Sequence, residues 1–190
     1  MTLTEPDPSI DILFSAERIA ARVEELAEEI VSGTADFSGS TDPSGELLIV
    51  VILKGSFVFA ADLIRALDRA GASPRVDFIT LSSYGAGTAS SGTVTLTHDL
   101  AEDVAGRSVL IVDDVLESGR TLAFACETLR SRGAADVRTC LLLDKPEKRE
   151  VPIEADYVGF AIGDQFVVGY GLDMAHRYRG LPYIGVVRTV

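Results

Sequence analysis

The sequence predicts an α/β fold in which helices cover both faces of a parallel sheet. Three apolar runs support this prediction, at Leu47–Leu53, Val109–Val112 and Thr139–Leu143. Strands that are buried on both faces form continuous apolar runs, whereas half-exposed strands alternate. After the first two runs, apolar residues recur at spacings of three and four, over Phe57–Leu67 and from Arg120 onward, which indicates strand–turn–helix units.

Size, charge and hydropathy narrow the possible classes of protein. The 190 residues are enough for one domain with a proper core, and no repeat or linker divides them. Acidic residues outnumber basic ones by 29 to 17, for a net charge of -12, which argues against binding to a nucleic-acid backbone. The apolar runs are too short to cross a bilayer and no N-terminal export signal is evident, so we expect no membrane contact and a cytoplasmic location.

The N-terminal part predicts a short edge strand at Ile12–Phe14 and a helix that begins after Ser15, a candidate N-cap. Apolar residues then repeat at helical spacing, at Ile19, Val23, Leu26 and Ile30. Because the other face is acidic, we expect a surface helix that packs on the core by one stripe.

A lysine stands at the end of the first apolar run, in the turn Lys54-Gly55-Ser56. Open α/β sheets bind ligands beyond the carboxyl ends of their strands, so this turn is a candidate binding site. An ordinary solvated lysine at a turn is the alternative interpretation.

The segments Val76–Leu81 and Thr93–Thr97 predict the two strands of a hairpin. The tip between them, at about 83–93, consists of small residues and has almost no apolar anchor except Tyr84. We therefore expect the tip to be mobile without a ligand. A hairpin tip with no role is the alternative.

The second apolar run ends in two acids, Asp113 and Asp114, and Ser118, Gly119 and Thr121 lie where the next helix should begin. A helix start carries unpaired N–H groups and the positive end of the dipole, which suits a phosphate. The two acids could hold sugar hydroxyls beside it, so the stretch indicates a ribose 5-phosphate site. Alternatively, the two acids are merely solvated and cap the helix.

The third apolar run ends in Asp144-Lys145-Pro146, so a lysine again marks the end of a strand. Tyr157–Ile162 is apolar with two glycines, and Ile184–Val187 predicts a last strand. The two cysteines, Cys126 and Cys140, lack metal-ligand spacing, and we predict that both are small buried apolar groups.

These motifs resemble those of the type I phosphoribosyltransferases. The central string of an apolar strand, two acids, two apolar residues, an acid and Ser-Gly-Arg-Thr is similar to the family's phosphoribosyl pyrophosphate motif. Leu-Lys-Gly-Ser resembles its pyrophosphate turn, and Ser-Ser-Tyr-Gly its active-site lid. The later strings Leu-Leu-Asp-Lys-Pro, Phe-Val-Val-Gly-Tyr-Gly-Leu-Asp and Arg-Tyr-Arg-Gly-Leu-Pro-Tyr-Ile-Gly resemble bacterial members that act on hypoxanthine and guanine. The resemblance runs in family order from about Ile12 to Val187.

The resemblance implies one domain over 1–190, with the family's parallel sheet as a core at about 46–145. A small hood would come from about 10–45 and 146–190, and a flexible hairpin lid from about 83–93. The implied activity is purine salvage: the 5-phosphoribosyl group passes from phosphoribosyl pyrophosphate to hypoxanthine or guanine, which gives IMP or GMP and pyrophosphate. Magnesium is the implied cofactor, and a homodimer or homotetramer the implied assembly.

The resemblance also implies roles for individual residues. Those expected to bind the phosphoribosyl group are Asp113, Asp114, Glu117, Ser118, Gly119, Arg120 and Thr121. Those expected at the pyrophosphate are Lys54, Gly55 and Arg179, and those in the lid are Ser83 and Tyr84. Those expected at the purine are Lys145, Phe166, Val167 and Asp173, and those at magnesium are Asp113, Asp114 and Asp173. The Leu53–Lys54 peptide is expected to be cis.

Physical arguments accompany the expected purine contacts. An ammonium has only donors, so Lys145 suits the 6-oxygen of hypoxanthine or guanine and would meet the amino group of adenine donor to donor. Phe166 would stack on the ring, unless it is an ordinary core residue. The Val167 carbonyl would accept from the 2-amino group of guanine, and the 2-oxygen of xanthine would face it unfavourably.

Glu117 departs from the family pattern, which has aspartate at this position. The acid there is expected to face the purine N7 and to act as general base. Glutamate keeps the carboxylate but adds a methylene, and a misplacement of about 1 Å can cost roughly 10²-fold in rate. We therefore expect a working but slower enzyme.

Three other readings of the sequence remain open. A catalytically weak regulator of the same fold could sense nucleotides, and Glu117 slightly favours it. A related enzyme could prefer xanthine or a pyrimidine. A phospho-acceptor domain could use Asp113 or Asp114, although the rest of the motifs argues against it.

Overall fold

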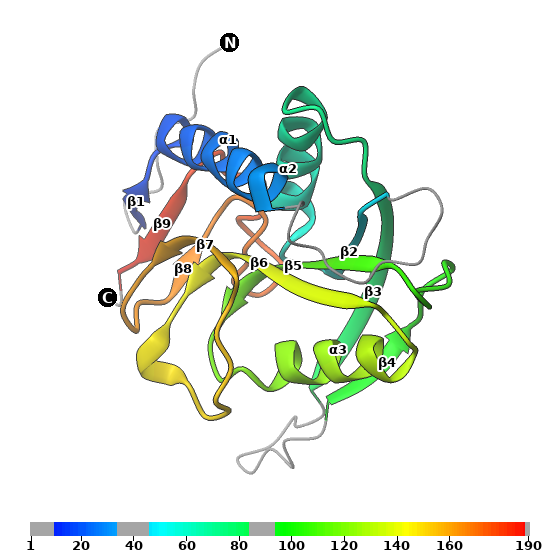
Figure 1. Ribbon diagram of the computed structural model, residues 1–190. Coiled ribbons are helices and arrows are strands. Elements are labelled where there is room, and N and C mark those ends of the chain that lie inside the picture. The colour runs from blue at the N-terminus through cyan, green and yellow to red at the C-terminus, as the bar shows by residue number, and fades with distance from the viewer. Residues whose placement is uncertain (1–9, 34–45, 84–93, 189–190) are drawn as a thin grey trace.

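The computed structural model describes residues 10–33, 46–83 and 94–188. A six-stranded sheet has the order β4-β3-β2-β5-β6-β7 (Figure 1). Its strands are β2 (Leu48–Leu53), β3 (Arg75–Ser83), β4 (Val94–His98), β5 (Ser108–Leu116), β6 (Asp136–Asp144) and β7 (Tyr157–Ala161). All neighbours are parallel except β3 and β4, which form the expected hairpin. The predicted fold class is therefore confirmed.

Helices cover both faces of this sheet. Helices α1 (Ala16–Gly33) and α2 (Phe57–Arg69) lie on one side and α3 (Arg120–Ser131) on the other (Figure 1). Alternate residues of β5 enter the two layers: Leu110 and Val112 pack with α1 and α2, and Val109 and Ile111 pack with α3. This two-sided burial explains why the strand is apolar without alternation.

A smaller antiparallel sheet combines the two ends of the chain, in the order β1-β9-β8. It contains β1 (Ile10–Phe14), β8 (Val167–Val168) and β9 (Ile184–Val187). The expected edge strand at the N-terminus is thus present and belongs to this sheet. By contrast β7, in the segment assigned to the hood, pairs with β6 in the main sheet.

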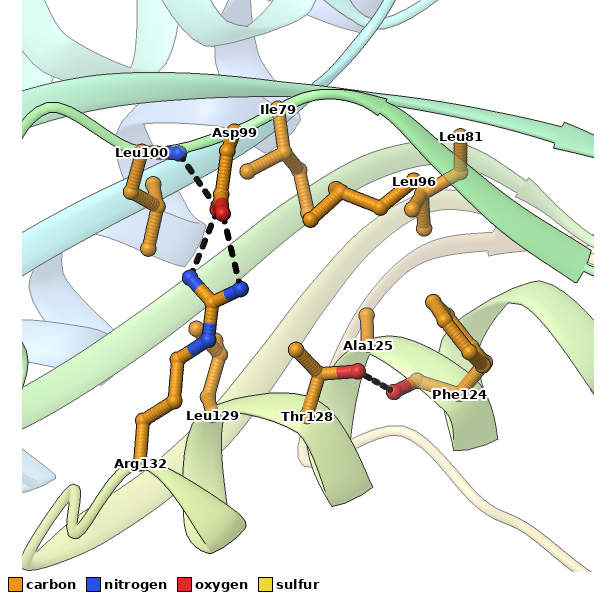
Figure 2. Close-up of a pocket in the computed structure, with 10 residues that line it drawn as sticks. All are labelled: Ile79, Leu81, Leu96, Asp99, Leu100, Phe124, Ala125, Thr128, Leu129 and Arg132. Atoms are coloured by element: carbon orange, nitrogen blue, oxygen red, sulfur yellow. Dashed lines mark hydrogen bonds and ion pairs between the residues drawn. The ribbon is translucent and has the colours of Figure 1, made fainter.

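A small apolar hollow lies between the β3–β4 hairpin and α3 (Figure 2). Arg132 closes one side through a bidentate pair with Asp99, at 2.6 and 2.9 Å. Apart from Thr128, the side chains that form the rest of its wall are apolar and include Ile79, Leu96 and Leu129. The hollow thus belongs to the packing of α3 on the sheet.

Candidate active site

The site lies where the parallel strands end. Because β2, β5 and β6 run in the same direction, their carboxyl ends bring three separate motifs to one edge of the sheet. An open hollow there is lined by seven residues predicted from the sequence: Lys54, Gly55, Asp113, Asp114, Thr121, Asp173 and Arg179. Residues more than 100 positions apart in the chain thus share one cavity.

Tight backbone contacts hold these motifs together. The Leu53–Lys54 peptide is cis, as expected. A Cβ at Gly55 would overlap the carboxylate of Asp114, and one at Gly171 would overlap the Gly55 carbonyl. Gly171 also has a φ of 102°, in the left-handed region that favours glycine. Only glycine at these two positions allows the turn at residues 54–56, the acid pair and the C-terminal segment to meet.

The acid pair lies at the end of β5, with Asp113 buried and Asp114 partly buried. Asp113 is only 7% exposed, and burial raises its pKa well above the usual value of 3.8, with the negative charge of Asp114 adding to the shift. Burial also raises the pKa of Asp114. The backbone N–H of Asp114 donates to Asp113 at 2.9 Å, and that of Val115 to Asp114 at 2.9 Å. Two adjacent carboxylates, one buried and one partly buried, favour a cationic or hydroxyl-bearing ligand.

The acids partly fit a magnesium site. Asp173 faces the same hollow, but its carboxylate pairs with Arg179 at 2.5 Å. Within residues 10–33, 46–83 and 94–188, no three histidine, cysteine or acidic side chains are close enough to hold a metal by themselves. Magnesium usually takes one or two carboxylates plus water and phosphate oxygens, so this donor set fits an ion that arrives with a phosphorylated substrate.

The loop that we predict to bind phosphate lies directly before α3. Gly119 has a φ of 85° and α3 begins at Arg120, so the first N–H groups of the helix lack intrahelical acceptors. Ser118 Oγ accepts from the Arg120 N–H at 3.4 Å, and Thr121 lines the hollow. Arg120 does not line the hollow, and its guanidinium pairs with the exposed Glu150 at 2.7 Å.

Lys145 and Glu117 form an ion pair beside this hollow, with Nζ and Oε1 2.5 Å apart. The lysine side chain is only 6% exposed, whereas that of the glutamate is 52% exposed. Phe166 is 55% exposed, which excludes the reading as an ordinary core residue, and Val167 is buried in β8. These four residues do not line the hollow that holds the acid pair.

Two interactions of the site were not foreseen from the sequence. Arg149, in a segment that indicated only a charged loop, donates to the Leu116 and Glu117 carbonyls. Tyr170 OH donates to Asp62 in α2 at 2.6 Å and so ties α2 to the segment that leads to Asp173. The expected lid, with Tyr84, lies outside the described residues, and Ser83 is the last residue of β3.

The remaining expectations concern the cysteines and the membrane. Cys126 and Cys140 are buried free thiols, as predicted. Among the helices of the described ranges, none has the length and apolar character needed to span a bilayer.

The sequence matches the model of the phosphoribosyl transferase domain over residues 9–175. The chain therefore belongs to the phosphoribosyltransferase family, and its fold is that of the type I members.

Within this family the chain groups with the hypoxanthine and hypoxanthine-guanine phosphoribosyltransferases. It is 44% identical over 179 residues to the hypoxanthine phosphoribosyltransferase of Escherichia coli K12. The match covers 94% of this chain and 96% of that protein. A hypoxanthine-guanine phosphoribosyltransferase of Bacillus anthracis is 43% identical with a TM-score of 0.82, over 93% of this chain and 98% of that one. A mutant of the hypoxanthine phosphoribosyltransferase of Trypanosoma cruzi, in complex with the product IMP, is 38% identical with a TM-score of 0.88. The match covers 97% of this chain and 94% of that one.

The relatives differ in length. The chain covers 26% of the bifunctional protein TilS/HprT of Listeria innocua, to which it is 44% identical over 177 residues.

Proposed function

We propose that this protein transfers the 5-phosphoribosyl group of phosphoribosyl pyrophosphate to hypoxanthine or guanine in purine salvage, and releases pyrophosphate with IMP or GMP. The observation that carries the proposal is the cavity at the strand ends, which joins the acid pair, the turn at Lys54 and Gly55, and Arg179. Relatives that are 44% and 45% identical over nearly the whole chain support it.

The activated sugar lies over the end of β5. The first N–H groups of α3, with Ser118 and Thr121, bind its 5-phosphate. Asp113 and Asp114 accept from the ribose hydroxyls, which relieves the mutual repulsion of the two carboxylates. Lys54, the Gly55 backbone and Arg179 hold the pyrophosphate, since a guanidinium suits phosphate oxygens.

Magnesium would be held by Asp113, Asp114 and Asp173 together with substrate oxygens. When bound, the ion supplies positive charge that neutralises the leaving pyrophosphate. Arg179 already lies against Asp173, so a cationic side chain stands beside the same oxygens.

The purine is bound and oriented by the β5 and β6 ends. Lys145 donates to the 6-oxygen, and its burial makes an unmatched amino group at this position costly. Phe166 stacks on the ring with its exposed face. The Val167 carbonyl accepts from the 2-amino group of guanine. Glu117 takes the proton from N7 while N9 bonds to the sugar carbon and the pyrophosphate leaves.

The test is nucleotide formation from four bases with phosphoribosyl pyrophosphate and magnesium. We expect turnover of hypoxanthine and guanine, and little of xanthine and adenine. Lys145→Met should abolish the preference for 6-oxopurines over adenine, whereas Lys148→Met, at an exposed lysine that pairs with Asp164, should not. No turnover of any base by the unmodified protein would overturn the proposal.

One observation favours a second function, that of a weakly catalytic nucleotide sensor. The Glu117–Lys145 pair occupies both groups that a purine needs, so the ligand must first break it. Tight binding of phosphoribosyl pyrophosphate or IMP without turnover would support this reading. A homodimer or homotetramer and a cytoplasmic location remain predictions, the first of them testable by light scattering.

A further inference from the structure

Three successive carbonyl groups at the end of β5 all turn toward one segment, residues 145–151. The Leu116 carbonyl accepts from the first backbone N–H of that segment at 2.9 Å and from Nη1 of Arg149 at 3.1 Å. The same Nη1 donates to the Glu117 carbonyl. The Ser118 carbonyl accepts from two further N–H groups, both at 3.0 Å.

This pattern matters because a carbonyl oxygen repels phosphate, whereas an N–H group attracts it. In a trans peptide a carbonyl and the N–H of the next residue point in opposite directions. With the carbonyls of Leu116, Glu117 and Ser118 turned toward residues 145–151, the N–H groups that follow them point away from that segment. Arg149 supplies two of these bonds. Its removal would take the side-chain donor from the Glu117 carbonyl, whereas the Leu116 carbonyl would keep its bond from the Lys145 N–H.

The guanidinium of Arg149 also holds the neighbouring strand. Its Nη2 donates to the carboxylate of Asp144, which directly precedes Lys145. Leu116 and Asp144 are the last paired residues of β5 and β6, so Arg149 bridges the point where the two strands separate. Its side chain is 16% exposed, and a rigid fork makes such paired contacts better than an ammonium does.

We propose that Arg149 is a positioning residue, which fixes the spacing between the phosphate loop and the purine lysine. This inference rests on the function proposed above. The loop binds the phosphate end of the nucleotide and Lys145 binds the base end, so a ligand that carries both ends is sensitive to the distance between them. Hypoxanthine alone contacts only the base end and is not sensitive to that distance.

The test compares Arg149→Lys with Arg132→Lys. The second variant is a matched control, because Arg132 also pairs with an aspartate (Figure 2). It follows the C-terminal end of α3, at the opposite end of this helix from the phosphate loop. For each variant we would measure the melting temperature, kcat, the KM of both substrates, and the equilibrium affinities for IMP and for hypoxanthine.

We expect R149K to lower kcat and the affinity for IMP by about 10- to 100-fold, because a shift of about 1 Å can cost that much. The affinity for hypoxanthine should stay within about 3-fold, and R132K should change none of these quantities by more than that. Asp144→Asn keeps the bonds of Arg149 to the carbonyls and should give a smaller loss of the same kind, which keeps the test informative if R149K is poorly folded.

A change of less than about 5-fold in both kcat and IMP affinity for R149K would overturn the proposal, whatever the melting temperature, and would leave Arg149 as a purely structural contact. An equal loss of hypoxanthine affinity would also overturn it. If the unmodified protein binds IMP without turnover, the proposed function fails but the IMP comparison still decides the role of Arg149. If it neither binds IMP nor turns over, both fail.

Discussion

Replacing Glu117 by aspartate should make the enzyme faster and less stable at the same time. The substitution draws the carboxylate back by about one carbon–carbon bond, ~1.5 Å, which opens the 2.5 Å contact with Lys145. The glutamate side chain is half exposed and the lysine is buried, so the pair is worth more than a surface pair and less than a buried one. We take about 1 kcal/mol, between these limits.

Two consequences follow from this estimate. A purine no longer has to break the pair, so the KM for hypoxanthine should fall about 5-fold, the equivalent of about 1 kcal/mol. The carboxylate also returns to the family's position, and kcat should rise by up to about 10², the ceiling for a misplacement of about 1 Å. The ligand-free protein should lose about 1 kcal/mol of unfolding free energy, because the buried Lys145 loses its partner.

The assay is initial-rate kinetics at saturating phosphoribosyl pyrophosphate, with hypoxanthine varied, beside thermal unfolding without ligand. Glu117→Gln is the control, since it keeps the length of the side chain but removes the base, and it should lose about 10²–10⁴ in kcat. If turnover of E117D is unchanged or lower, glutamate is not a handicap. If its KM does not fall, the ion pair does not compete with the purine.

Three further predictions address the rest of the site. Asp113→Asn should abolish turnover yet stabilise the ligand-free protein at neutral pH, seen as a higher melting temperature in chelator. The sign follows from the raised pKa of Asp113. Its favourable contribution to the unfolding free energy is present below pH 3.8 and is lost as the pH rises through the raised pKa. Equal melting temperatures of the variant and the unmodified protein at about pH 7 would contradict this prediction. Gly55→Ala should lower kcat/KM for phosphoribosyl pyrophosphate about 10²-fold, because the new methyl group would overlap the Asp114 carboxylate, and unchanged kinetics would refute that contact. Tyr170→Phe should cost about 1 kcal/mol of stability and raise the KM for phosphoribosyl pyrophosphate a few-fold, since the bond to Asp62 is lost; a KM that rises for hypoxanthine alone would argue against this tether.

Local patterns could predict the strand–turn–helix units, because a strand that is buried on both faces has a continuous apolar sequence. The run Val109–Val112 is apolar since its residues alternate between two cores, and Gly119 marks the turn before α3 through its positive φ. The role of Phe166 could not be decided in this way. A core residue and a stacking residue look alike until the exposed fraction, 55%, is known.

Contacts across the fold could not be predicted, because they depend on strand register and side-chain length. Glu117 and Lys145 are 28 residues apart and meet only because β5 and β6 pair with Leu116 opposite Asp144. Tyr170 and Asp62 are 108 residues apart, and their bond depends on how α2 lies against the C-terminal segment. Family resemblance supplied roles for single residues but not these pairings.

The acid pair of the site lowers the stability of the protein when no ligand is bound. Asp113 is buried, Asp114 beside it is partly buried, and the burial and like charge of the pair cost stability in the ligand-free protein. The charge of Arg179 offsets part of this cost at Asp114, although its guanidinium is bound to Asp173. A ligand that brings hydroxyl donors and a cation relieves the repulsion between the two carboxylates. Selection for binding therefore accounts for a pair of carboxylates that selection for stability would replace.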